Sequence, residues 1–132
     1  MALSNEQVLR KAVDYFVKGD MEGVASIITD DFTVHVQGSN QLTGDYMGKD
    51  EFLNGLIGKM MGLTDGRFEL EPHDVLGSTD GDHAVGIYTI RATRGDRSIE
   101  WRHVNVYHVR DEKLAEVFFT PHDYDEWNDF WS

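Results

Sequence analysis

The stretch from Asp30 to Phe52 reads DDFTVHVQGSNQLTGDYMGKDEF, and its pattern decides the fold. Apolar and polar residues alternate from Phe32 to Gln37, which is the period of a β-strand with two different faces. Three glycines follow within a polar loop, and a residue without a Cβ lets the backbone turn sharply. The sequence therefore predicts a strand, a loop and the start of a helix, and we expect this stretch to form one wall of any ligand site.

Composition restricts the classes of function that the chain can have. The 132 residues are most simply one domain over residues 1–132. The net charge of -12 repels phosphate backbones and anionic lipids, so we expect neither nucleic acid nor membrane as a partner. The sequence has no cysteine, no apolar run of membrane-spanning length and no signal-like amino terminus, and we expect a cytoplasmic location.

Helices are predicted on both sides of this opening stretch. Ser4 and Gln7 fit a capping box, and an apolar stripe at helical spacing runs from there to Gly19. Asp20 can cap a second, shorter helix. A third helix is expected from about residue 50 to residue 61.

Strands dominate the second half of the chain. We expect them over residues 67–76, 83–94, 98–109 and 113–120, separated by short turn-forming clusters, with a last helix over residues 122–131. Short connections favour antiparallel neighbours, so the four strands should form a meander. Helices followed by a long antiparallel sheet make an α+β fold, and a curved sheet with helices on its concave side would enclose a cone-shaped pocket.

Four segments carry a resemblance to a known family. They read GDMEGVASIITDDFTVHVQG, LTGDYMGKDEFL, VNVYHVRDEKLAEVFF and DYDEWNDFWS. Together they resemble the SnoaL-like branch of the nuclear-transport-factor-2-like superfamily over nearly the whole chain. The resemblance implies a cystatin-like α+β barrel. It leaves activity open, because the superfamily includes ketosteroid isomerases, polyketide cyclases, epoxide hydrolases and dehydratases as well as domains without catalysis.

The ketosteroid isomerases of this superfamily allow a check residue by residue. They use a carboxylate base and an oxyanion hole made of a Tyr and a protonated Asp. In this sequence the base position falls on Val36 or His35, depending on the register. The Tyr position falls on Ala12 and the Asp position on Asn105. The resemblance therefore does not imply a steroid isomerase of the standard kind.

His35 is the sharpest catalytic candidate. A neutral imidazole can accept a proton near neutral pH. The alternative is that His35 lies on the solvent-facing side of its strand, opposite Phe32, Val34 and Val36. Asp45 is a candidate to orient this histidine, or it is simply a turn residue after Gly44.

A second set of candidates lies on one face of the strand over residues 98–109. Asn105 and His103 would stabilise a substrate oxygen as hydrogen-bond donors, or they would merely satisfy one another inside the core. The remaining residues expected to line the pocket are Asp45, Tyr46, Phe52, Leu56, Trp101 and Phe119. In the alternative interpretation of this face, Trp101 and Tyr107 are core residues.

The sequence indicates no metal site and no cofactor, because it has no HExxH pair, phosphate loop or dinucleotide fingerprint. The first hypothesis is a cofactor-independent enzyme that transfers a proton next to a carbonyl of a hydrophobic small molecule, as an isomerase, cyclase or dehydratase. The second is a non-catalytic binding or accessory domain that uses the same pocket. The third is a protein-interaction module. We also expect a homodimer.

Overall fold

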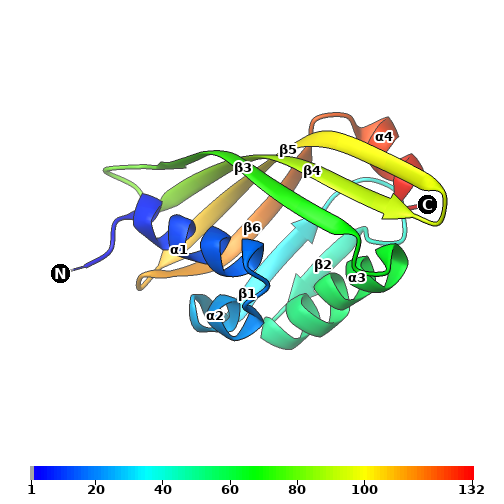
Figure 1. The fold of residues 1–132 in the computed structure, drawn as a ribbon. Helices are drawn as coiled ribbons and strands as arrows, with labels where there is room; N and C mark the ends of the chain where they lie inside the picture. Colours follow the sequence, from blue (N-terminus) through cyan, green and yellow to red (C-terminus); the bar gives the residue numbers. More distant parts are fainter. Residues whose placement is uncertain (1) are drawn as a thin grey trace.

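The computed structural model describes residues 2–132 and has an α+β architecture in which one curved sheet wraps around helices (Figure 1). The helices are α1 (Asn5–Val17), α2 (Met21–Ser26), the π-helix η1 (Glu51–Ile57), α3 (Gly58–Thr64) and α4 (Tyr124–Phe130). None of the helices in this described part of the chain is long and apolar enough to cross a lipid bilayer.

A six-stranded sheet in the order β2-β1-β6-β5-β4-β3 forms the frame of the molecule. Its strands are β1 (Ile28–Val36), β2 (Gly44–Met47), β3 (Phe68–Gly77), β4 (His83–Arg94), β5 (Arg97–Arg110) and β6 (Lys113–Pro121). The strands from β3 to β6 form the predicted antiparallel meander. Strand β1 joins the meander at its β6 edge through a parallel pairing with β6. Strand β2 then pairs with β1 in antiparallel fashion.

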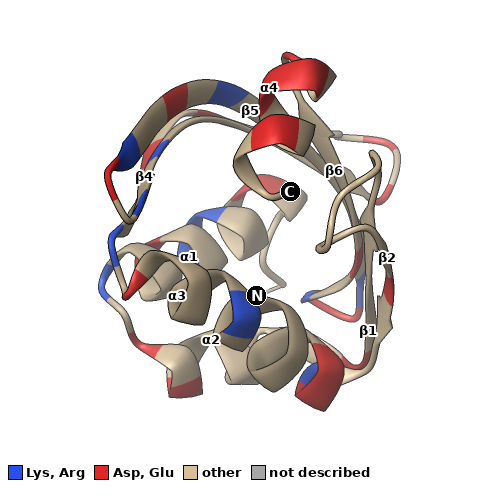
Figure 2. Cartoon of the chain, turned by 90° about the vertical axis from the view of Figure 1, so that its right-hand side faces the viewer, with Lys and Arg blue, Asp and Glu red and all other residues tan. Residues whose placement is uncertain are grey.

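Viewed along the strands, the sheet forms an arch with α1, α2 and α3 under its concave side and α4 near one end (Figure 2). The curved α+β fold predicted from the sequence is therefore confirmed. Figure 2 also shows acidic residues spread over helices, strands and loops, so the charge of -12 is not gathered into one acidic tail.

Helix α1 closes the concave side against β3. The predicted capping box is present, because the Ser4 side chain accepts from the backbone N–H of Gln7 and the Gln7 side chain accepts from that of Ser4. The buried face of the helix presents Val8, Leu9, Ala12 and Val13 to the core. Gly77, at the end of β3, allows the close approach, since a Cβ there would collide with the backbone of Glu6.

Two elements differ from the expectation. The loop after β1 contains a short strand, β2, whose four residues are too few to show a hydrophobic period. The helix expected from residue 50 opens as the π-helix η1 and continues as α3 to Thr64. Gly55 and Gly58, which are poor helix formers, lie within η1 and at the start of α3.

Candidate functional site

A cavity of about 90 Å³ lies between the concave face of the sheet and the helices. Helix α1 contributes Ala12, Val13 and Phe16, and η1 and α3 contribute Phe52, Ile57 and Met60. Strand β1 contributes Phe32, and α4 contributes Trp127. The lining is mostly apolar, so the hydrophobic effect favours an apolar occupant.

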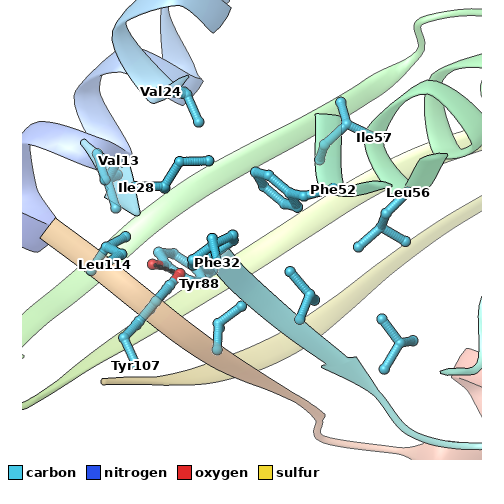
Figure 3. Close-up of a cluster of buried hydrophobic side chains, with 14 of the residues drawn as sticks. Val13, Val24, Ile28, Phe32, Phe52, Leu56, Ile57, Tyr88, Tyr107 and Leu114 are labelled. Carbon is cyan, nitrogen blue, oxygen red and sulfur yellow. Dashed lines mark hydrogen bonds between the residues drawn. The ribbon is translucent and has the colours of Figure 1, made fainter. Parts of the chain in front are cut away.

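A line of polar side chains crosses this apolar lining along β4 and β5. The hydroxyl groups of Tyr88 and Tyr107 are 2.8 Å apart, and Asn105 Nδ2 donates to the Tyr107 oxygen at 3.0 Å. His103, next on the same face of β5, also lines the cavity. Figure 3 shows the two phenol groups reaching toward one another beside Val13, Phe32 and Leu114.

The protonation of His103 follows from its neighbours. The indole Nε1 of Trp101 lies 3.2 Å from His103 Nδ1 and can only donate, so Nδ1 is the acceptor and carries no hydrogen. Burial disfavours the imidazolium and lowers the pKa of His103 to about 4, although Asn105 weakly opposes the shift. At pH 7 the ring is therefore neutral, and its single hydrogen is on Nε2.

Two polar atoms of this line have no partner within the protein. They are His103 Nε2 and Asn105 Oδ1, which means that the nearby Asn105 amide does not form a well-shaped hydrogen bond with the imidazole. His103 is 1% and Asn105 6% exposed, so bulk water does not reach them freely. Buried polar groups are nearly always hydrogen-bonded, so an unpartnered donor and an unpartnered acceptor side by side mark a place where a further polar group fits.

All the titratable groups that line the cavity are neutral at pH 7. Burial raises the pKa of Tyr88 well above its ordinary value, and it raises the pKa of Tyr107 against the opposing effect of hydrogen bonds from its neighbours. No Asp or Glu belongs to the lining within residues 2–132. The cavity therefore contains hydrogen-bonding groups but no carboxylate base.

His35 lies on the other face of the sheet, outside the cavity. Its Nδ1 is 2.7 Å from Asp45 Oδ1, its Nε2 is 2.7 Å from Glu116 Oε2, and its ring stacks on Phe118 at 4.5 Å. Partial burial works against the charged ring, but the hydrogen bonds to Glu116 and Asp45 outweigh it and raise the pKa of His35. Of the two orientations open to His35, the structure has the one that points away from Phe32 and the cavity.

The other predicted site residues separate into three groups. Phe52 and Phe119 line the cavity together with His103 and Asn105. Tyr46, Leu56 and Trp101 belong to the surrounding core rather than to the lining; the Tyr46 hydroxyl donates to the carbonyl of Leu42. Asp45 is exposed beside His35. One N–H of the Asn105 amide, expected to donate to a substrate oxygen, donates to Tyr107 instead.

Tyr88 is a polar lining residue that sequence reasoning missed. Its strand reads Ala84, Gly86, Tyr88, Ile90 and Ala92 on the inner face. A phenol two residues after a glycine on a buried strand face is the signal that could have identified it. Gly86 is required by the arrangement, since a Cβ at this position would overlap the Tyr88 hydroxyl.

Comparison with known proteins places the chain in a family. The model of the SnoaL-like domain matches residues 9–117. A Mycobacterium tuberculosis relative, the uncharacterised protein MT0039, is 26% identical over 117 residues, which cover 86% of this chain and 88% of the relative.

Solved structures agree on the fold. A Xanthomonas campestris protein of unknown function with a cystatin-like fold superposes with a TM-score of 0.88 at 21% identity, covering 98% of this chain and 99% of that one. An NTF2-like protein of Burkholderia pseudomallei gives 0.83 at 21% identity, with 98% and 99% covered. TerC, co-crystallised with polyporic acid, gives 0.80 at 18% identity, with 96% of each chain covered. The chain belongs to the SnoaL-like domain family.

Proposed function

We propose that the protein binds a small, largely apolar molecule in the cavity between the sheet and helix α1. The observation that carries this proposal is the pair of unpartnered polar atoms, His103 Nε2 and Asn105 Oδ1, inside an otherwise apolar lining. An apolar wall with a few placed polar groups is the usual make-up of a small-molecule site. The co-crystallisation of TerC, a protein of the same fold, with polyporic acid is in keeping with this use.

Binding without catalysis is better supported than proton transfer. A base for abstraction next to a carbonyl has to be within hydrogen-bond reach of the substrate. His35 is on the outer face, and the free nitrogen of His103 carries a hydrogen at neutral pH. The cavity groups are thus arranged to donate to and accept from a ligand rather than to remove a proton from carbon.

The size of the cavity decides which ligands are tested first. At about 90 Å³ it is smaller than the roughly 150 Å³ cavity that holds a benzene ring, so a polycyclic molecule would have to displace lining side chains. A screen should therefore run from single-ring compounds to steroids, terpenoid epoxides and aromatic polyketides. A ligand at a hundredfold excess over its Kd adds about 2.7 kcal/mol of stability, which a thermal-shift measurement detects.

A pair of variants on α1 tests whether a hit occupies the cavity. Ala12→Leu adds a side chain to the lining and should abolish the thermal shift and the change in tryptophan fluorescence expected from Trp127. Val17→Leu is the matched control, because Val17 is 53% exposed on the same helix. An unchanged shift in Ala12→Leu would place the ligand elsewhere and contradict the proposal.

We also propose a cytoplasmic homodimer that forms through the outer face of the sheet. A cross-strand row of apolar residues runs over four neighbouring strands there: Leu76, Val85, Val106 and Phe118. Leu76 is 52% and Phe118 38% exposed. A contiguous apolar row on a protein surface is the kind of feature that a partner subunit covers.

A further inference from the structure

We propose that the ligand of this cavity carries a neutral hydroxyl group, as an alcohol, enol or phenol does, which accepts a hydrogen bond from His103 Nε2 and donates one to Asn105 Oδ1. The inference rests on the proposed function, because it requires a small molecule in the cavity. It goes further by naming the functional group that the ligand presents to β5.

The chain's own contacts fix which atom donates and which accepts. The indole N–H of Trp101 occupies His103 Nδ1, so the remaining nitrogen of the neutral ring is a donor. The Tyr107 oxygen occupies Asn105 Nδ2, so the atom left without a partner is the carbonyl oxygen, an acceptor. Among single functional groups, a hydroxyl both accepts and donates through one oxygen.

The spacing of the two residues suits one bridging oxygen. His103 and Asn105 are two positions apart on β5, so their side chains project from the same face. Residues at this spacing lie about 7 Å apart along a strand. A single oxygen between the two side chains can then be within hydrogen-bond reach of both.

A ketone, a carboxylate and a hydrocarbon each leave at least one of the two atoms unsatisfied. A ketone can accept from His103 Nε2 but offers nothing to Asn105 Oδ1. A carboxylate would place its negative charge against that carbonyl oxygen, and no Lys or Arg lines the cavity within residues 2–132. A hydrocarbon satisfies neither atom. Sites built to bond a hydroxyl strongly reject analogues that lack it.

The test uses four five-membered-ring probes of similar size: cyclopentanol, cyclopentanone, methylcyclopentane and cyclopentanecarboxylate. Their affinities are measured at pH 7 by thermal shift, because the ketone absorbs weakly where tryptophan is excited and would disturb a fluorescence titration. We expect cyclopentanol to bind at least tenfold more tightly than the ketone and the hydrocarbon. The carboxylate should bind most weakly of all.

Asn105→Leu separates the hydroxyl contact from apolar binding. It removes the acceptor at similar side-chain size and should bring the affinities of cyclopentanol and cyclopentanone to within about twofold of one another. Val17→Leu, on the exposed side of α1, should keep the wild-type preference. The wild-type ranking alone still decides the question where Asn105→Leu does not fold.

The outcomes distinguish this inference from the proposed function. Equal affinity for the alcohol, the ketone and the hydrocarbon would support the cavity as a ligand site but contradict the inference that the ligand carries a hydroxyl group. Tighter binding of the ketone would mean that the Asn105 amide is turned around and presents a donor. That result would also contradict the inference that the ligand carries a hydroxyl group. Failure of all four probes to bind would contradict the proposed function itself, and the inference with it.

Discussion

Two histidines on opposite faces of the sheet show how position decides the chemistry of one residue type. His103 is enclosed by Trp101, Phe119 and Trp127, so burial keeps its ring neutral. His35 lies between two carboxylates, which favour the charged ring. The inner histidine is thus fitted to neutral hydrogen bonding and the outer one to an ion pair.

The low pKa of His103 predicts a loss of stability in acid. Its folded-state pKa is about 4 and the ordinary value is 6.5, so between these pH values the unfolded chain binds a proton that the folded chain does not. The free energy of unfolding should therefore fall as the pH falls from 6.5 to 4, by roughly 3 kcal/mol from this group. Urea denaturation between pH 4 and pH 7 measures it.

The control for this prediction is a pair of Gln variants. His103→Gln keeps an oxygen that can accept from Trp101. It should reduce the fall in the free energy of unfolding between pH 7 and pH 4, although it lowers the stability at pH 7. His122→Gln, at an exposed position, should show the same fall in the free energy of unfolding as the wild type. Parallel curves for the wild type and His103→Gln would contradict the prediction, because they would mean that His103 binds a proton equally well in the folded and unfolded chains.

The alternation of residues along a strand predicts the face of the sheet on which each side chain lies. To that extent the residues of the site were predictable. Alternation placed His103 and Asn105 on one face of β5, and the structure has both in the cavity lining. It also left His35 on the face opposite Phe32, where the structure has it, outside the cavity in which the catalytic hypothesis required it. Glu116 as a second partner of His35 was not predictable, because it comes from β6 through a parallel pairing that the pattern of one strand does not contain.

At the scale of elements, α4 depends on two arginines from the turn between β4 and β5. Arg94 donates to the carbonyl oxygens of Phe130 and Ser132, at 2.6 and 3.1 Å, and Arg97 pairs with Asp129 at 2.9 Å. These contacts reach the carboxyl end of the helix, where free carbonyl groups and the helix dipole favour a cation. Because α4 carries Trp127, the arginines help to hold one end of the cavity closed.

Arg94→Met should loosen α4 while it leaves the sheet intact. Hydrogen bonds to charged groups contribute about 1.5–3 kcal/mol, so the amides of residues 124–130 should exchange with solvent at least tenfold faster. Trp127 should also become more exposed, with a red shift of its emission. Arg91→Met is the matched control, since Arg91 pairs with Glu71 and Glu100 and not with α4. Unchanged exchange in Arg94→Met would show that α4 is held without the Arg94 contacts.

The elements were easier to predict than their arrangement. The long strands carry several hydrophobic periods and turn-forming clusters between them, and His83–Arg94 was predicted with the bounds that β4 has. The parallel pairing of β1 with β6 joins segments about 80 residues apart and has no local signature. The π-helical opening of the third helix was also missed, because a hydrophobic stripe does not distinguish one helix type from another.

At the scale of the molecule, the sheet separates two environments with different uses. Its concave face holds the cavity, and its convex face holds the apolar row of Leu76, Val85, Val106 and Phe118, next to His35. Because the two faces share strands but not side chains, each can be altered while the other is kept. The proposed dimer can therefore be tested apart from ligand binding.

Val106→Glu should convert the proposed dimer into a monomer. Val106 lies between Val85 and Phe118 in the cross-strand row. In an isologous dimer, both subunits would bring the new carboxylate into the interface. Burying an unpaired charge costs several kcal/mol, so the dissociation constant should rise at least a hundredfold. Light scattering coupled to gel filtration measures the mass of both proteins, and circular dichroism establishes that the variant is folded.

Val17→Glu makes the same change on the exposed side of α1, away from the sheet, and should remain a dimer. It also controls for the added negative charge, which matters because two chains of charge -12 repel one another. For the same reason, salt should strengthen the wild-type dimer, since at 0.1 M ionic strength charges are screened beyond about 10 Å. A wild-type monomer at every salt concentration, or a dimer that survives Val106→Glu, would contradict an interface on the convex face.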